Sequence, residues 1–303
     1  METYKLKADE NGTASIFFEQ MPEDIAVMNA KYQADIVVPY LTFPVLEETD
    51  CVISAFSTRN GGVSTGMYSS MNLSFARGDE SEAVIENRSR ILSVLNLADR
   101  KLVTSAQTHT TNVCRVDRAD GKGISERSEL RDVDGLITND PSVVLLTYYA
   151  DCVPLYFVDP VHKAIGLSHS GWRGTVLNMA GKTAEAMERE FATNPNDLIC
   201  AIGPSICKDC YEVSEDVAEQ FLETFKNSDR SIVFPLGNGK YKIDLWESNR
   251  QLLLSSGVRE EQIHTAGICT CCNHKILFSH RGSQGRRGNL AALLALKDIN
   301  EHN

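Results

Sequence analysis

Short apolar runs alternate along this chain with stretches in which apolar residues recur every three or four positions. The runs are rich in β-branched and aromatic residues, as is typical of buried strands. They predict strands at 51–56, 143–149, 153–158, 164–167, 198–202, 263–268 and 275–278. Because amphipathic stretches separate several of these runs, the pattern indicates an α/β or α+β fold.

Three helices are predicted from periodicity and from the residues at their ends. The first covers 81–97, where the apolar residues share one face. The second begins at Ser214, which is followed by two acidic residues that favour a first helical turn. The third covers 244–256 and stops at Gly257, since glycine often follows the last turn of a helix.

The chain shows no internal division. It has 303 residues, of which 42% are hydrophobic, so it can bury a large core. No repeat and no Pro/Gly/Ser-rich linker interrupts it. The charged stretch 118–134 is more typical of an exposed loop than of a domain boundary. We therefore expect a single domain over 1–303, with 1–30 as a peripheral N-terminal extension.

The net charge and the cysteine content exclude several classes of protein. A net charge of −11 argues against a nucleic-acid partner, which needs a clustered basic surface. Neither a leader segment nor a run of apolar residues long enough to span a bilayer is evident, so we expect a cytoplasmic protein without a membrane partner. Nine cysteines, an odd number spread along the chain, indicate thiols or metal ligands rather than a disulfide framework.

The densest chemical signal lies in three segments, QTHTTNV, YYADCVPLYF and LSHSGWRGT. They place His109, Cys152 and His169 at the ends of predicted elements. Two imidazoles and one thiolate suit zinc, and three protein ligands leave a fourth position for water, whose pKa the metal would lower to about 7. On spacing alone, a purely structural role for these buried side chains stays open.

A different interpretation needs no metal. Cys152 could act as a nucleophile with His169 or His109 as its base and Asp151 nearby, which would support acyl transfer. Asp151 could also orient a histidine through a hydrogen bond.

Four segments in order, FSTRNGGVSTGMYSSMNLS, ADCVPLYFVDP, HSGWRGT and CTCCNHKILFSHRGSQGRRG, resemble the YfiH/YlmD family. This family is also described as multicopper polyphenol oxidase or laccase-domain proteins and as purine nucleoside phosphorylases. The resemblance implies an αββα sandwich similar to the catalytic domain of cytotoxic necrotizing factor, with zinc bound by His109, Cys152 and His169. It also implies phosphorolysis of adenosine, inosine or S-methyl-5'-thioadenosine and deamination of adenosine. Nucleoside and phosphate are the implied partners of a monomer or homodimer.

Two positions depart from the family pattern. Thr110 follows His109 where members usually carry glycine, and His280 precedes Arg281 where members usually carry tyrosine. A β-branched residue restricts the backbone beside the site. Substrate preference could differ as a result.

Phosphorolysis requires groups that hold phosphate, and the planar guanidinium of arginine suits that task. We expect Arg59, in the STRNGG loop, to be a catalytic and substrate-binding residue. The remaining candidates for substrate contacts are Asn60, Asn72, Arg173 and Arg281, with Arg286 as a further arginine for phosphate.

Two groups of cysteines lie outside these segments of the site. Cys207 and Cys210 form a CxxC, and Cys269, Cys271 and Cys272 crowd a later strand end. Four of them could make a structural zinc site. Because the two groups lack the spacing of a zinc ribbon, we expect most of these residues to be buried thiols.

The contending functions belong to different classes. A zinc-dependent purine nucleoside enzyme comes first. A copper-dependent polyphenol oxidase would need several copper ions and many histidines, whereas the chain has seven and only two lie in the site segments. A cysteine hydrolase acting on a cell-wall-related amide would use Cys152 covalently, and a pure binding module would leave the open metal position unused.

Overall fold

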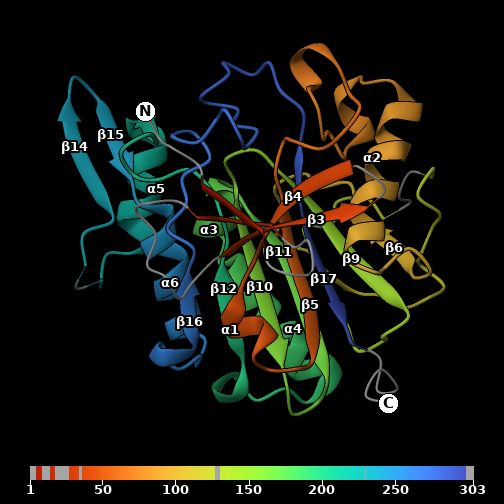
Figure 1. Ribbon diagram of the computed structural model, residues 1–303. Helices are drawn as coiled ribbons and strands as arrows, with labels where there is room; N and C mark the ends of the chain where they lie inside the picture. The colour runs from red at the N-terminus through yellow and green to blue at the C-terminus, as the bar shows by residue number, and fades with distance from the viewer. Residues whose placement is uncertain are drawn as a thin grey trace.

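Two β-sheets pack face to face and carry helices on their outer faces (Figure 1). The computed structural model describes residues 5–8, 14–17, 27–33, 36–126, 130–228 and 230–297. The eight-stranded sheet has the order β1 (Lys5–Ala8), β2 (Ala14–Phe17), β3 (Val27–Gln33), β4 (Ile36–Thr42), β5 (Val52–Ser57), β17 (Leu290–Leu296), β9 (Val143–Tyr149) and β6 (Lys101–Thr104). The described part of 1–30 thus adds strands to one edge of this sheet.

The second sheet has six strands and the third has three. The six-stranded sheet has the order β16 (Ile263–Thr265), β12 (Ile199–Ile202), β10 (Val153–Asp159), β11 (Ala164–Ser170), β8 (Gly135–Thr138) and β7 (Val113–Arg115). The small sheet has the order β13 (Glu212–Ser214), β15 (Lys240–Ile243) and β14 (Val233–Gly237).

Six α-helices accompany the sheets. They are α1 (Pro44–Glu47), α2 (Ser81–Val94), α3 (Trp172–Val176), α4 (Met179–Phe191), α5 (Glu215–Thr224) and α6 (Leu245–Ser255). Short 3₁₀ helices cover Gly66–Tyr68, Phe75–Arg77, Pro195–Asp197 and Glu260–Gln262. Within the described part of the chain, no helix is long and apolar enough to cross a membrane.

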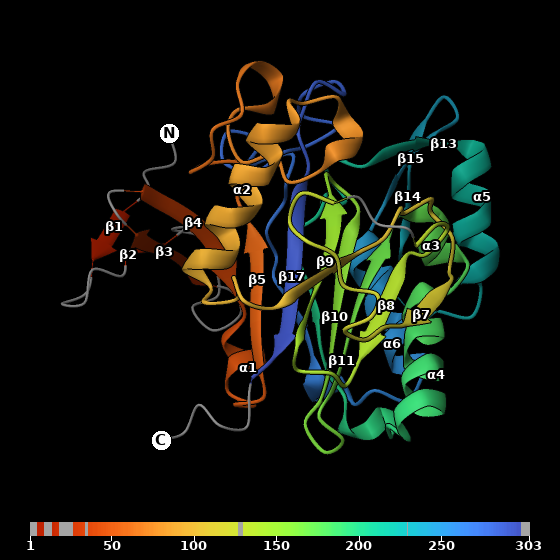
Figure 2. The ribbon, with the colours of Figure 1, turned by 90° about the vertical axis from the view of Figure 1, so that its right-hand side faces the viewer.

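Three apolar clusters define four layers, and Figure 2 shows α2 on one side of the sheets and α4, α5 and α6 on the other. One cluster lies between the two large sheets and includes Phe56 and Leu294 from one sheet and Tyr156 and Ile165 from the other. A second joins α2 to the outer face of the eight-stranded sheet. The third joins α4, α5 and α6 to the outer face of the six-stranded sheet. The expected αββα sandwich is confirmed.

Most predicted elements are confirmed to within a few residues. Strands β5, β9, β10, β11 and β12 and helices α2, α5 and α6 lie where the pattern predicts them, and β16 is shorter than its predicted run. Asp244 caps α6 by accepting a hydrogen bond from the backbone N–H of Glu247.

The strand predicted at 275–278 is wrong. The chain there forms turns in which the N–H groups of Ile276 and Leu277 both donate to the carbonyl of Asn273, each at 2.9 Å. Leu277 and Phe278 are nevertheless fully buried in the cluster between the sheets. Burial explains the apolar run, and the backbone bonds within the turn replace strand pairing.

Strand β17 was not predicted, although it lies between β5 and β9 in the larger sheet. Its sequence, LAALLAL, consists of residues that favour helices. All seven residues are buried, because the strand has α2 on one face and the second sheet on the other. Packing on both faces overrides local propensity here.

We expect Leu293→Ala and Leu294→Ala each to lower the free energy of unfolding by about 3 kcal/mol. Leu293 packs beneath α2, whereas Leu294 packs between the sheets. Chemical denaturation measures both changes. Val161→Ala, at a side chain 62% exposed, is the control and should change the free energy by less than about 0.5 kcal/mol. A similarly small change at either leucine would contradict a strand buried on both faces.

Candidate metal centre

Three side chains that are distant in sequence converge at one end of the sandwich. His109 lies in the loop by which the chain passes from β6 in one large sheet to β7 in the other, and Cys152 lies in the turn that makes the same crossing from β9 to β10. His169 is near the end of β11, where it faces Pro154 of β10. The ligand atoms of the three residues all lie within 4.8 Å of one another.

The geometry of this cluster suits a metal ion. The Cys152 Sγ is 3.9 Å from the His109 Nε2, and the two imidazole rings meet edge to face with centroids 5.0 Å apart. Nitrogen and sulfur ligands of a tetrahedral zinc ion stand about 3.5 Å apart, which requires little movement from these positions. Three ligands also leave one position open for water or substrate.

Asp134 holds the two histidines in place. Its fully buried carboxylate accepts a hydrogen bond from His169 Nδ1 at 2.7 Å and from the backbone N–H of His109 at 3.1 Å. The hydrogen bond between His169 and Asp134 places the proton of His169 on Nδ1 and leaves Nε2 free to bind a metal. Burial would raise the pKa of Asp134, but the hydrogen bond and charge of His169 outweigh it and lower that pKa.

The loop of His109 wraps around the same carboxylate. The backbone N–H groups of Thr108 and Thr110 donate to the second carboxylate oxygen at 3.0 and 3.1 Å, and the Thr110 hydroxyl donates to it at 3.2 Å. Thr110, which replaces the usual glycine of the family pattern, therefore contributes a hydrogen bond of its own. Sequence analysis missed Asp134 because it ends the charged stretch 118–134, which we expected to be exposed.

Without a metal ion, the three side chains already favour a thiolate. Burial would raise the pKa of the Cys152 thiol, but the positive charge of His169 and hydrogen bonds from both histidines lower it to about 6. Burial would lower the pKa of His169, but the negative charge of Cys152 and the bond to Asp134 raise it to about 9. A thiolate is the form of cysteine that binds metals.

Two residues at the centre have backbones in the left-handed region. His109 has φ 66° and Asp151 has φ 85°, a conformation that is uncommon outside glycine. Asp134 fixes the first, as described. Asp151 is fixed by Thr270, whose hydroxyl donates to its carboxylate at 2.7 Å, and by the backbone N–H of Arg281, also at 2.7 Å.

Comparison with known proteins shows the family of the chain. Residues 53–297 match the family described as multi-copper polyphenol oxidoreductase laccase. The chain belongs to this family.

The chain is 39% identical over 227 residues to a protein named purine nucleoside phosphorylase from Bacteroides thetaiotaomicron, covering 74% of this chain and 84% of that one. It is 36% identical over 232 residues to a protein named adenosine deaminase RL5 from an unidentified prokaryote, covering 76% and 88%. The crystal structure of YlmD from Geobacillus stearothermophilus superposes with a TM-score of 0.82 at 30% identity, covering 89% of this chain and 99% of that chain.

Three of the residues expected to touch substrate are occupied by contacts within the protein. The Arg59 guanidinium donates to the carbonyls of Ser69 and His274 and lies over the Phe278 ring. Asn72 is fully buried, and its amide bonds to Ser74, Asp79 and Asn289. The Arg281 guanidinium donates to the carbonyls of Cys210 and Glu212. These contacts join loops that are distant in sequence, and a role of the three residues in binding substrate stays a prediction.

The other predicted residues lie at the surface. Arg173 stacks on its neighbour Trp172, with the guanidinium 4.3 Å from the ring centroid. Asn60 and Arg286 are exposed. Among the described residues, Asp151 bonds to Thr270 and Arg281 and not to a histidine. The carboxylate that orients the candidate ligand His169 is Asp134.

The sequence did not point to Arg77 and Arg287, two neighbouring arginines of which Arg287 is close enough to Cys152 to be affected by its charge. Burial and then the charge of Arg77 lower the pKa of Arg287 to about 10, while the negative charges of Asp151 and Cys152 act in the opposite direction. Among the described residues, the buried Nε atoms of Arg77 and Arg287 have no hydrogen-bond partner. His280 lies near both, since their charges lower its pKa after burial does. In the sequence, the two consecutive arginines at 286–287 were the pattern that could have pointed to Arg287.

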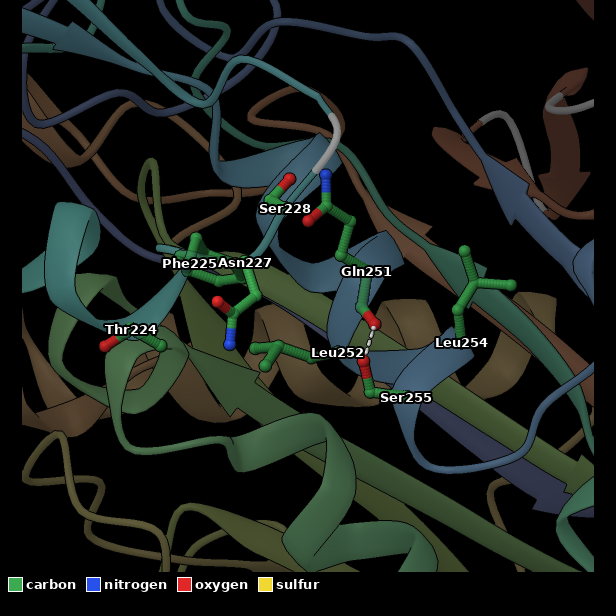
Figure 3. Close-up of a pocket in the computed structure, with 8 residues that line it drawn as sticks. All are labelled: Thr224, Phe225, Asn227, Ser228, Gln251, Leu252, Leu254 and Ser255. Carbon is green, nitrogen blue, oxygen red and sulfur yellow. Dashed lines mark hydrogen bonds between the residues drawn. The ribbon is translucent and has the colours of Figure 1, made fainter.

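A surface pocket elsewhere on the molecule carries none of this chemistry. Figure 3 shows it between the end of α5 and α6, with Asn227, Leu252 and Ser255 among its lining residues. None of the candidate metal ligands lines it. The candidate metal ligands therefore lie outside this pocket.

Gly171 provides a selective test of the centre. A Cβ at this position would lie 2.9 Å from His109 Cδ2 and 3.0 Å from Cys152 Sγ, although its φ of −72° suits any residue. We therefore expect Gly171→Ala to fold and yet to lose most of its bound metal, as measured by elemental analysis of the purified protein. Gly174→Ala, whose Cβ would make only ordinary contacts at 3.5 Å or more, is the matched control. Equal metal content in the two variants would contradict the proposed ligand geometry.

Proposed function

We propose that this protein is a zinc-dependent enzyme of purine nucleosides. It would split adenosine, inosine and S-methyl-5'-thioadenosine with phosphate and deaminate adenosine to inosine. The observation that carries the proposal is the convergence of His109, Cys152 and His169 around an open metal position, with His169 oriented by Asp134. The names of the relatives, purine nucleoside phosphorylase and adenosine deaminase, support the choice of substrate.

The donor set favours zinc over a group of copper ions. Among the described residues, the clusters of potential metal ligands are this one and one of four cysteines, and only two histidines take part. Several copper ions would need many more histidines. When bound, zinc would supply Lewis-acid catalysis and lower the pKa of a water in its open position.

The residues of the chain supply the remaining chemistry. Asp134 and His169 fix the ligand geometry from behind, and the strained backbone at Asp151 places Cys152 at the turn between the sheets. Arg287 is close enough to Cys152 to be affected by its charge, and Arg77 lies beside Arg287. Arg287 donates from Nη1 to Gly288 and Asn289, while the buried Nε of each arginine has no partner among the described residues. Such groups suit phosphate, whose oxygens arginine binds with charge-assisted hydrogen bonds.

One specific observation favours a second candidate. His169 stands between Asp134 and the Cys152 thiol, which is the order of nucleophile, base and orienting carboxylate in cysteine hydrolases. In that case Cys152 would attack an amide directly, and activity would persist after removal of metal.

Cys152→Ala tests whether the metal centre is needed for nucleoside turnover. We expect the variant to lose the metal of this centre and to reduce turnover of adenosine to background, because one of three ligands is gone. Chromatography would detect adenine, formed only with phosphate, and inosine, formed with or without it. Cys114→Ala, at a thiol on β7 outside the centre, should retain metal and activity. Full nucleoside turnover by Cys152→Ala without metal would overturn the proposal, and amide hydrolysis by a metal-free wild type would favour the hydrolase.

Arg287→Ala tests the phosphate site. Loss of a charge-assisted hydrogen bond should raise the KM for phosphate about 10- to 100-fold. Deamination of adenosine needs no phosphate, so its rate should change little and serves as an internal control for folding. Arg189→Ala, at an exposed arginine on α4 outside the candidate site, should leave both reactions unchanged. A phosphate KM that is equal in all three proteins would exclude Arg287 from the site.

A further inference from the structure

Two loops meet beside the metal centre at the ends of neighbouring parallel strands. β12 and β16 pair in register from Cys200 with Ile263 to Ile202 with Thr265. The chain continues this pairing beyond both strands, because the N–H of Ser205 donates to the carbonyl of Ile268 at 3.1 Å. Each loop then carries a pair of cysteines into the same space.

Four thiols from these loops form a compact cluster. The Sγ atoms of Cys207, Cys210, Cys269 and Cys272 all lie within 4.8 Å of one another, and those of Cys210 and Cys272 are 3.5 Å apart. All four are free thiols. Four sulfur ligands at about 2.3 Å from a tetrahedral zinc ion stand about 3.8 Å apart, close to these separations.

The backbone around the cluster turns as ligand loops require. The N–H groups of Cys210 and Tyr211 donate to the carbonyl of Cys207 at 3.1 and 3.0 Å, which closes the first CxxC turn. The N–H groups of Cys207 and Cys272 donate to the Sγ of Cys269 at 3.3 and 3.4 Å. Such bonds stabilise negative charge on sulfur, the form in which cysteine binds metal.

We propose that Cys207, Cys210, Cys269 and Cys272 bind one zinc ion as a structural site. Four protein ligands leave no open position, which distinguishes this site from a catalytic one. Zinc binding would release the remaining thiol protons to solvent. The proposal does not depend on the nucleoside activity. The expectation that most of these cysteines are buried is wrong, since of the five only Cys269 is buried.

The sequence contains a second CxxC motif in addition to that of Cys207 and Cys210. Within the segment CTCC, Cys269 and Cys272 form a second CxxC, and Cys271 lies outside the cluster. Long separation from Cys207 and Cys210 concealed the pairing, because a zinc ribbon would bring its two CxxC segments much closer in sequence.

The position of the site indicates what the ion would stabilise. Thr270, between two of the ligands, donates its hydroxyl to Asp151, and the N–H of Ile206 donates to the Asp151 carbonyl at 3.0 Å. The Arg281 guanidinium donates to the carbonyl of Cys210 at 3.1 Å. A zinc ion here would tie together the loops that fix Asp151, the residue before Cys152.

Metal content and sulfur coordination test the proposal. X-ray absorption at the zinc edge on Cys152→Ala, which lacks a ligand of the other centre, should show four sulfur atoms at about 2.3 Å. Cys272→Ser, at an exposed ligand, should bind one zinc ion fewer than wild type and unfold at a lower temperature. Cys271→Ser is the matched control and should retain both zinc ions.

The outcomes are distinct from those for the catalytic centre. Wild-type protein with no zinc in sulfur-only coordination, with iron in this position, or with Cys210 and Cys272 joined as a disulfide would overturn the proposal. The Cys152→Ala spectrum, to which the other centre contributes no zinc, gives this answer even if Cys272→Ser does not fold. If the wild-type protein has an intact four-sulfur site but does not turn over nucleosides, only the proposed function is contradicted.

Discussion

The buried carboxylate of Asp134 is the interaction on which the metal centre depends. A buried charge is costly unless it is fully hydrogen-bonded. Here the compensating donors are the backbone N–H groups of Thr108, His109 and Thr110 and the ring of His169. Satisfying one carboxylate therefore fixes both the path of the His109 loop and the orientation of the His169 ring. Catalytic geometry and the stability of a buried charge are in this way the same constraint.

The four-layer architecture explains why the candidate metal ligands lie together at one end of the sandwich. Two of the candidate ligands, His109 and Cys152, lie where the chain passes from one large sheet to the other. At such crossings the backbone leaves the regular ladders, so side chains can point toward a common centre while rigid strands hold the loop ends. The paired cysteine loops after β12 and β16 reach the same region through Asp151. The two groups of candidate metal ligands thus share one set of supporting loops.

Local sequence predicted the parts of the fold in which propensity and burial agree. Runs such as Val143–Tyr149 combine β-branched residues with burial of all but one side chain, and they form strands as expected. The run at 275–278 has three apolar residues but forms turns, and LAALLAL at Leu290–Leu296 favours a helix yet forms a central strand. In both cases packing against distant elements decides the backbone, and a local pattern contains no record of those partners.

The sequence by itself identified the candidate metal ligands His109, Cys152 and His169, which the structure brings together. It did not reveal Asp134, the arginine pair Arg77 and Arg287, or the union of two CxxC segments. It favoured Arg59 for substrate, which stays a prediction, and the fold shows in addition that this guanidinium donates to the carbonyls of two loops. Only the tertiary structure decided these roles, because hydrogen bonding and burial depend on groups that the folded chain brings together from distant positions.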